Sequence, residues 1–145
     1  MEGREDKAWL LRNRWNPFPI SGSLALADGV ISFTLDEDAA NATLGWLEDT
    51  LETEDISERI EAGEEVVAFS IPLEECQIGW PMTGGGATMV IEGPTRNWVI
   101  THHHPVGGAM LQTLNLISGR GKVRAWKKTF AAAEKEGEES EPAET

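Results

Sequence analysis

The chain has a single cysteine, Cys76, among its 145 residues, so it contains no internal disulfide. A protein without a disulfide framework is typical of a reducing compartment, and we therefore expect a cytoplasmic location. The N-terminal sequence is charged and lacks the sustained apolar core of a secretory signal peptide. No segment approaches the ~20 apolar residues that cross a bilayer. We therefore expect no transmembrane helix.

Basic residues are also scarce, since 12 Lys and Arg face 25 Asp and Glu, for a net charge of −13. The imbalance is uneven: residues 28–75 contain 15 acidic side chains and one basic one, whereas residues 76–128 contain six basic and one acidic. Such a molecule repels nucleic acid and anionic membranes over long distances, so the charge disfavours both as partners. A local basic site in the second half remains compatible with it.

Hydrophobic periodicity predicts a β-hairpin in "SGSLALADGVISFTL". Two apolar runs flank Asp28-Gly29, a pair that supplies the positive φ angles of a tight two-residue turn. The inward-facing side chains predicted for its two strands are Leu24 and Leu26, then Ile31, Phe33 and Leu35. A chain of this length forms one domain that buries roughly 70% of the surface of its unfolded form.

After Leu35 the apolar residues change to a helical period. The stripe of one amphipathic helix is formed by Ala40, Leu44, Leu47 and Leu51. Asp36 or Asp38 stands where it can cap the first amides, and Asp55 and Glu58 have the spacing of a capping box for a second, shorter helix. Most of the acidic residues lie in this region, and we interpret them as a solvated face rather than as an acidic docking surface.

The second half returns to strands and closes with a helix. Val67, Phe69 and Ile71 alternate on one face as far as Pro72, and Cys76, Ile78 and Trp80 alternate after it. Two further strands are predicted over 87–92 and 97–104. A final helical stripe is formed by Val123, Trp126, Phe130 and Ala133.

Two segments carry a resemblance to a known family. "FSIPLEEC" (Phe69 to Cys76) and "GRGKVRAWKKTF" (Gly119 to Phe130) resemble elements of bacterial pleckstrin-homology-like (PH-like) domains of the GRAM type, in particular an uncharacterised actinobacterial branch. The resemblance covers about residues 20–133. It implies an α+β fold: a strongly bent antiparallel sheet or barrel with a C-terminal capping helix that buries Trp126. The helical insertion expected at 36–63, after the first hairpin, is a departure from the family pattern.

The resemblance also sets the expected domain limits. Residues 1–19 are expected to pack on the domain as an N-terminal segment, and the acidic residues 134–145 to form a disordered tail. The tight "ADGV" loop lacks the basic residues that phosphoinositide-binding PH domains carry there, which argues against inositol-phosphate recognition at that loop.

The three histidines of "ITHHHPVGG" are the only ones in the chain. On a strand, His102 and His104 share one face with Cα atoms ~7 Å apart, so both imidazoles could bind one metal, as in a metal-dependent hydrolase. No third ligand stands at a defined spacing, and we favour a strand end stopped by Pro105. Cys76 is interpreted as a core thiol rather than a nucleophile.

The best candidate binding site is the basic run in the last helix, formed by Arg120, Lys122, Arg124, Lys127 and Lys128. Such a cluster can bind a carboxylate, a phosphate or an acidic partner segment. It can equally be a solubilising face, or be neutralised by the chain's own acidic insertion or tail. In the N-terminal "WLLRNRWNPFP", we favour packing of the aromatic side chains over stacking on nucleic-acid bases.

No nucleophile elbow, zinc-protease motif, paired-cysteine motif or dinucleotide fingerprint is present, so no cofactor is predicted. The sequence therefore favours a non-enzymatic PH-like domain that binds another protein. The two alternatives are the hydrolase using His102 and His104 and weak peripheral binding to anionic lipid.

Overall fold

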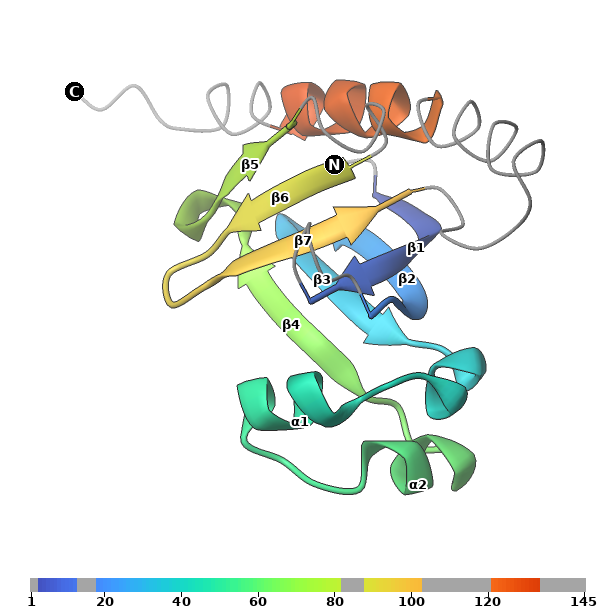
Figure 1. Ribbon diagram of the computed structural model, residues 1–145. Helices are drawn as coiled ribbons and strands as arrows, with labels where there is room; N and C mark the ends of the chain where they lie inside the picture. The colour runs from blue at the N-terminus through green and yellow to red at the C-terminus, as the bar shows by residue number, and fades with distance from the viewer. Residues whose placement is uncertain (1–2, 13–17, 82–87, 103–120, 134–145) are drawn as a thin grey trace.

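The computed structural model describes residues 3–12, 18–81, 88–102 and 121–133 and has an α+β fold (Figure 1). Seven antiparallel strands form one sheet in the order β4-β3-β2-β1-β7-β6-β5. The strands are β1 (Arg4–Leu11), β2 (Ile20–Ala27), β3 (Val30–Leu35), β4 (Val67–Pro72), β5 (Gln77–Gly79), β6 (Thr88–Glu92) and β7 (Asn97–Thr101). A short 3-10 helix, η2 (Leu73–Glu75), joins β4 to β5.

The predicted hairpin is confirmed as β2 and β3. Asp28 and Gly29 have φ angles of 52° and 76°, the left-handed pair that a two-residue turn of this kind requires. The predicted core faces of both strands are also confirmed, since each of their named residues is buried. Strict alternation explains this success, because half-buried strands have a period of two.

Strand β1 lies in the middle of the sheet, between β2 and β7. The sequence predicted no strand in residues 1–19, and only their packing on the domain was expected. Within β1, Ala8 and Leu10 are fully buried, whereas the residues before them are polar and exposed or half-buried. The alternation is therefore too short to predict a strand. Its place in the sheet comes from pairing with β2 along seven residues, from Arg4 to Leu10.

The expected common face of Val67, Phe69 and Ile71 is wrong for Val67. The pairing of β3 with β4 shifts between Phe33 and Thr34, so that Phe33 faces Phe69 but Thr34 faces Val67. The extra residue is a β-bulge, which reverses the side on which the preceding residues point. Val67 is consequently 43% exposed, while Phe69 and Ile71 are buried.

The sheet curls strongly along its width. The rings of Phe69 on β4 and Trp98 on β7 stack with their centroids 4.9 Å apart. These strands are four positions apart in the sheet order, a separation of ~19 Å in a flat sheet with strands ~4.8 Å apart. The contact therefore requires the two halves of the sheet to face each other, and the core lies between them.

The insertion contains η1 (Glu37–Asn41), α1 (Gly45–Leu51) and α2 (Ile56–Glu61). The single amphipathic helix predicted from Ala40 to Leu51 is wrong, because a 3-10 turn ends at Asn41 and α1 begins four residues later. Asp36 caps η1 as expected, since its Oδ1 accepts the Ala39 N–H at 3.2 Å.

The capping box predicted for the second helix is not formed. Asp55 is the N-cap residue of α2 but has a left-handed backbone with φ of 60°, and its side chain caps no amide. Glu48 Oε2 accepts the Ile56 N–H instead, at 3.1 Å. A side chain from the preceding helix therefore satisfies the first amide of α2, which is a different amide from the one that a capping box assigns to Asp55. The predicted end at Gly63 is confirmed by its φ of 84°.

The C-terminal helix covers residues 121–133 and packs across one end of the sheet, beside β5 and β6 (Figure 1). Its buried side chains are the predicted stripe: Val123, Trp126, Phe130 and Ala133. In Figure 1 this orange helix and the green helices α1 and α2 lie at opposite ends of the molecule. The basic helix and the acidic insertion are thus separated by the sheet. Arg120, His103, His104 and residues 134–145 lie outside the described residues.

Candidate functional site

Trp126 anchors the C-terminal helix to the sheet. Its side chain is 0% exposed, and its ring centroid lies 5.5 Å from Phe130 and 6.2 Å from His102. Phe130 also contacts Trp80, at 6.0 Å. The burial predicted for Trp126 is confirmed, and it fixes which side of the helix faces solvent.

The indole N–H of Trp126 is the polar group at this anchor. Its Nε1 is buried and has no hydrogen-bond partner among the described residues, whereas buried N–H groups of this kind normally have one. The guanidinium carbon of Arg4 lies 5.7 Å from the ring centroid, within the range of a cation–π contact. In the described part of the chain, packing and the contact with the ring face therefore hold this anchor.

The residues of the predicted basic cluster differ in their exposure to solvent. Arg124, Lys127 and Lys128 are exposed, whereas Lys122 is half-buried. Lys127 Nζ lies 5.4 Å from the Trp80 ring centroid, a cation–π contact. In the described part of the chain, none of these four cations forms a salt bridge with a carboxylate. We call the exposed surface of Arg124, Lys127 and Lys128 the basic face.

His102 belongs to the core. Its side chain is 1% exposed, and Nε2 lies 3.3 Å from Met89 Sδ. Among the described residues, no group of three or more His, Cys, Asp and Glu side chains is placed to hold a metal ion. His104, the second ligand of the metal hypothesis, lies outside the residues described.

Cys76 is half-buried beside η2, with Sγ 3.6 Å from the Leu73 carbonyl oxygen. Burial raises the pKa of the Cys76 thiol, and the nearby carboxylate of Glu75 raises it further. Both effects disfavour the thiolate, which is the reactive form. This environment agrees with the interpretation of Cys76 as a packing residue.

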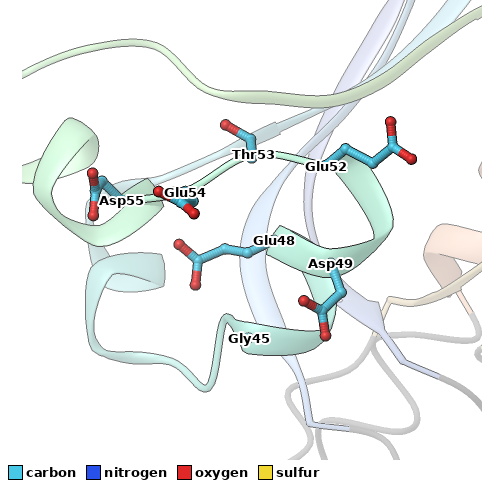
Figure 2. A pocket seen from close by; sticks show the side chains of 7 residues that line it. All are labelled: Gly45, Glu48, Asp49, Glu52, Thr53, Glu54 and Asp55. Carbon is cyan, nitrogen blue, oxygen red and sulfur yellow. The ribbon is translucent and has the colours of Figure 1, made fainter.

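The acidic insertion contains an open hollow with a volume of about 810 Å³ (Figure 2). Five carboxylates surround it: Glu48, Asp49, Glu52, Glu54 and Asp55. Glu48 is already engaged with the Ile56 amide, and Figure 2 shows the carboxylates pointing in different directions. The arrangement agrees with the predicted solvated face.

A smaller hollow, of about 360 Å³, lies where the end of β1, helix α1 and the start of β7 meet. We call it the arginine cleft. The residues that define it are Arg12, Trp46, Asp49, Thr50, Arg96 and Trp98. No pattern in the sequence predicted this combination, because its members come from three segments far apart in the chain and share no local motif. The interleaved Trp and Arg of the N-terminal segment were its only local signal.

The N-terminal aromatic residues differ in their burial. Trp9 is half-buried on β1, and Phe18 is 37% exposed. Phe18 supports the arginine cleft: its carbonyl oxygen accepts the Trp46 indole N–H at 3.3 Å. Trp15 lies outside the described residues.

Comparisons of the chain with protein-family models, curated proteins and solved structures found no match. Among the described residues, no helix has the length and apolar character needed to cross a membrane.

Proposed function

We propose that this protein is a non-enzymatic, cytoplasmic PH-like domain that binds an acidic segment of another protein through its basic face. The observation that carries the proposal is the set of three exposed cations, Arg124, Lys127 and Lys128, on a helix whose opposite side is buried. Their spacing of three and four residues places them together on one side of the helix. The buried Trp126 holds that side outward.

The PH-like part of the proposal rests on the resemblance together with the order of elements. An antiparallel sheet precedes a C-terminal helix that covers one end of it and buries a tryptophan. Those are the features that the resemblance implies. The helical insertion after β3 is a departure from that family pattern.

Charge supports an acidic partner. The molecule has a net charge of −13, but screening limits the influence of distant charges to roughly 8 Å at physiological salt. The electrostatic potential next to the basic face is therefore set mainly by its own three cations. The acidic insertion lies at the far end of the molecule and forms no salt bridge with the basic face. Within the described ranges, no carboxylate of the protein itself therefore neutralises the three cations.

The first test measures binding of a fluorescent poly-L-glutamate peptide as a surrogate for an acidic segment. Replacing Arg124, Lys127 and Lys128 by glutamine lowers the net charge by three and should weaken binding about tenfold or more. The matched control lowers it by the same three charges elsewhere, with Asn41→Asp, Thr43→Glu and Ala62→Glu at exposed positions of the insertion. The control should bind like the unmodified protein, and equal losses in both variants contradict the proposal.

The second test uses a photoreactive residue in place of Lys128 for crosslinking in native lysate, with the same residue at Ala62 as control. A discrete adduct is expected only from position 128, and it should be lost on adding poly-L-glutamate or on Arg124→Gln with Lys127→Gln. Adducts whose yield is unchanged by both treatments contradict the proposal. Flotation with phosphatidylserine vesicles, without peptide binding, would favour the lipid alternative, and stoichiometric zinc in the purified protein would favour the hydrolase alternative.

A further inference from the structure

The arginine cleft brings together groups that no single segment of the chain contains. Arg12 follows β1, Trp46, Asp49 and Thr50 belong to α1, and Arg96 lies in the turn that joins β6 to β7. Its volume of about 360 Å³ is in the range of small-molecule sites, which begin at roughly 300 Å³. The cleft lies on a different part of the molecule from the basic face and is independent of the proposed function.

The two arginines supply positive charge to the cleft. Neither forms a salt bridge with a carboxylate in the described part of the chain. Each guanidinium lies over a ring instead: Arg96 Cζ is 5.6 Å from the Trp98 centroid, and Arg12 Cζ is 5.9 Å from that of Phe18. A guanidinium held through its face keeps its N–H edge for an anion, and its fork matches a carboxylate.

The walls of the cleft are fixed before any ligand arrives. Trp98 is 7% exposed and stacks on Phe69. Trp46 is held by its indole hydrogen bond to the Phe18 carbonyl and by the Thr50 hydroxyl, which donates to the Trp46 carbonyl oxygen at 2.7 Å. Rigid aromatic walls favour a flat, apolar group on the ligand, because little conformational entropy is lost on binding.

The turn that carries Arg96 is held just as firmly. The Gly93 N–H donates to the Arg96 carbonyl oxygen at 3.0 Å. A Cβ added at Gly93 would lie 3.2 Å from that oxygen and 3.0 Å from Ile71 Cδ1. The backbone at Arg96 is therefore positioned by a close approach that a larger residue at 93 would disturb.

Asp49 determines the kind of anion. This residue lines both the arginine cleft and the acidic hollow, and it forms no salt bridge with either arginine among the described residues. Two guanidinium groups and one carboxylate sum to a single positive charge, so a monocarboxylate neutralises the cleft. A phosphate dianion would bring excess negative charge next to Asp49 in an already acidic protein. The Asp49 oxygens in turn require a hydrogen-bond donor.

We propose that the arginine cleft binds a small zwitterion with one carboxylate, one ammonium group and a flat ring, the chemistry of a free aromatic amino acid. The carboxylate bonds to Arg12 and Arg96, the ammonium group bonds to Asp49, and the ring lies against Trp46. A peptide segment does not meet this description, because its backbone amides replace the paired free charges.

Isothermal titration of the full chain with L-phenylalanine tests the proposal. Three analogues each lack one feature: 3-phenylpropanoate lacks the ammonium group, 2-phenylethylamine lacks the carboxylate, and L-alanine lacks the ring. L-phenylalanine should bind with a Kd of roughly 1 mM or below, and each analogue about tenfold or more weakly, as expected for the loss of a charged hydrogen bond or of ring burial. The proposal is overturned if L-phenylalanine shows no binding at a concentration about tenfold above this expected Kd. It is also overturned if phenyl phosphate binds more tightly than L-phenylalanine.

Variants give a result that a merely structural role would not produce. Arg96→Ala should weaken L-phenylalanine about ten- to a hundredfold, while Arg124→Ala on the basic face should leave it unchanged. Asp49→Asn should weaken L-phenylalanine but strengthen 3-phenylpropanoate, because it removes the only negative charge of the cleft among the described residues. If both ligands respond to Asp49→Asn in the same direction, the assignment of the ammonium group to Asp49 is wrong. Arg12→Ala replaces Arg96→Ala if circular dichroism shows the latter unfolded.

Discussion

Truncation of Trp126 to alanine tests the packing on which the basic face depends. The side chain is 0% exposed and contacts Phe130 and His102 at the junction of helix and sheet. Replacing a buried Trp or Phe by Ala costs about 3–5 kcal/mol, from lost transfer free energy and from the cavity left behind. A small domain has a free energy of unfolding of about 5–15 kcal/mol. The variant should therefore be marginally folded or partly unfolded at 25 °C.

Trp126→Phe isolates the effect of the indole N–H. The smaller ring leaves a modest void, which costs about 1–2 kcal/mol. It also removes a buried donor for which the described residues offer no hydrogen-bond partner, and an unsatisfied donor costs about 1–3 kcal/mol. The two terms nearly cancel, so we expect Trp126→Phe to lie within about 1.5 kcal/mol of the unmodified protein.

Urea denaturation followed by circular dichroism measures both variants. Val67→Ala serves as the control, since Val67 is 43% exposed and its truncation should cost about 0.5 kcal/mol or less. The slope of the free energy against urea should remain the same in Trp126→Phe. A loss below about 1 kcal/mol in Trp126→Ala would refute the inference that this indole anchors the helix.

Three further predictions concern single residues. Gly22→Ala places a Cβ 2.3 Å from the Thr34 carbonyl oxygen and should lower the free energy of unfolding by more than about 2 kcal/mol, measured by thermal or urea unfolding. In the matched variant Gly45→Ala, in α1, the added Cβ meets no atom within 4 Å, and the free energy of unfolding should rise by about 0.5 kcal/mol. Asp36→Ala removes the cap of η1 and the acceptor of the Ser21 hydroxyl, and should lower the free energy of unfolding by about 1–2 kcal/mol; a loss below about 0.3 kcal/mol would contradict it. Because burial raises the pKa of Cys76, iodoacetamide should alkylate it more slowly in the folded than in the urea-unfolded chain at pH 8. Equal alkylation rates in the two states would contradict the raised pKa. The same shift makes the protonated thiol contribute to the free energy of unfolding below its unfolded-state pKa, and this contribution is lost as the pH rises through the folded-state pKa.

The sequence predicted those elements whose burial follows a regular period. The β2–β3 hairpin, its core face and the buried stripe of the last helix are confirmed, because in each case local alternation coincides with the final environment. The faces of β4 were predicted less well, since the bulge opposite Phe33 and Thr34 depends on the partner strand. In the insertion, η1 and α1 stand where one helix was predicted, and Glu48 from α1 accepts the first amide of α2 in place of the predicted capping box.

The two candidate sites also differ in how far the local sequence predicts them. Lys122, Arg124, Lys127 and Lys128 are close in sequence, and a helix with one buried side separates the exposed cations from the buried residues in a predictable manner. The arginine cleft has no such signal, since Arg12, Asp49 and Arg96 belong to segments that only meet when the sheet curls.

By itself, the sequence determined the local periods, the Asp28-Gly29 turn, the separation of acidic from basic segments and the buried side of the last helix. Only the tertiary structure decided that β1 lies at the centre of the sheet, that Val67 faces outward, and that Phe69 meets Trp98. The physical reason is range: turn and helix preferences act between neighbours in the chain, whereas strand order, bulges and clefts depend on contacts between residues that are distant in sequence.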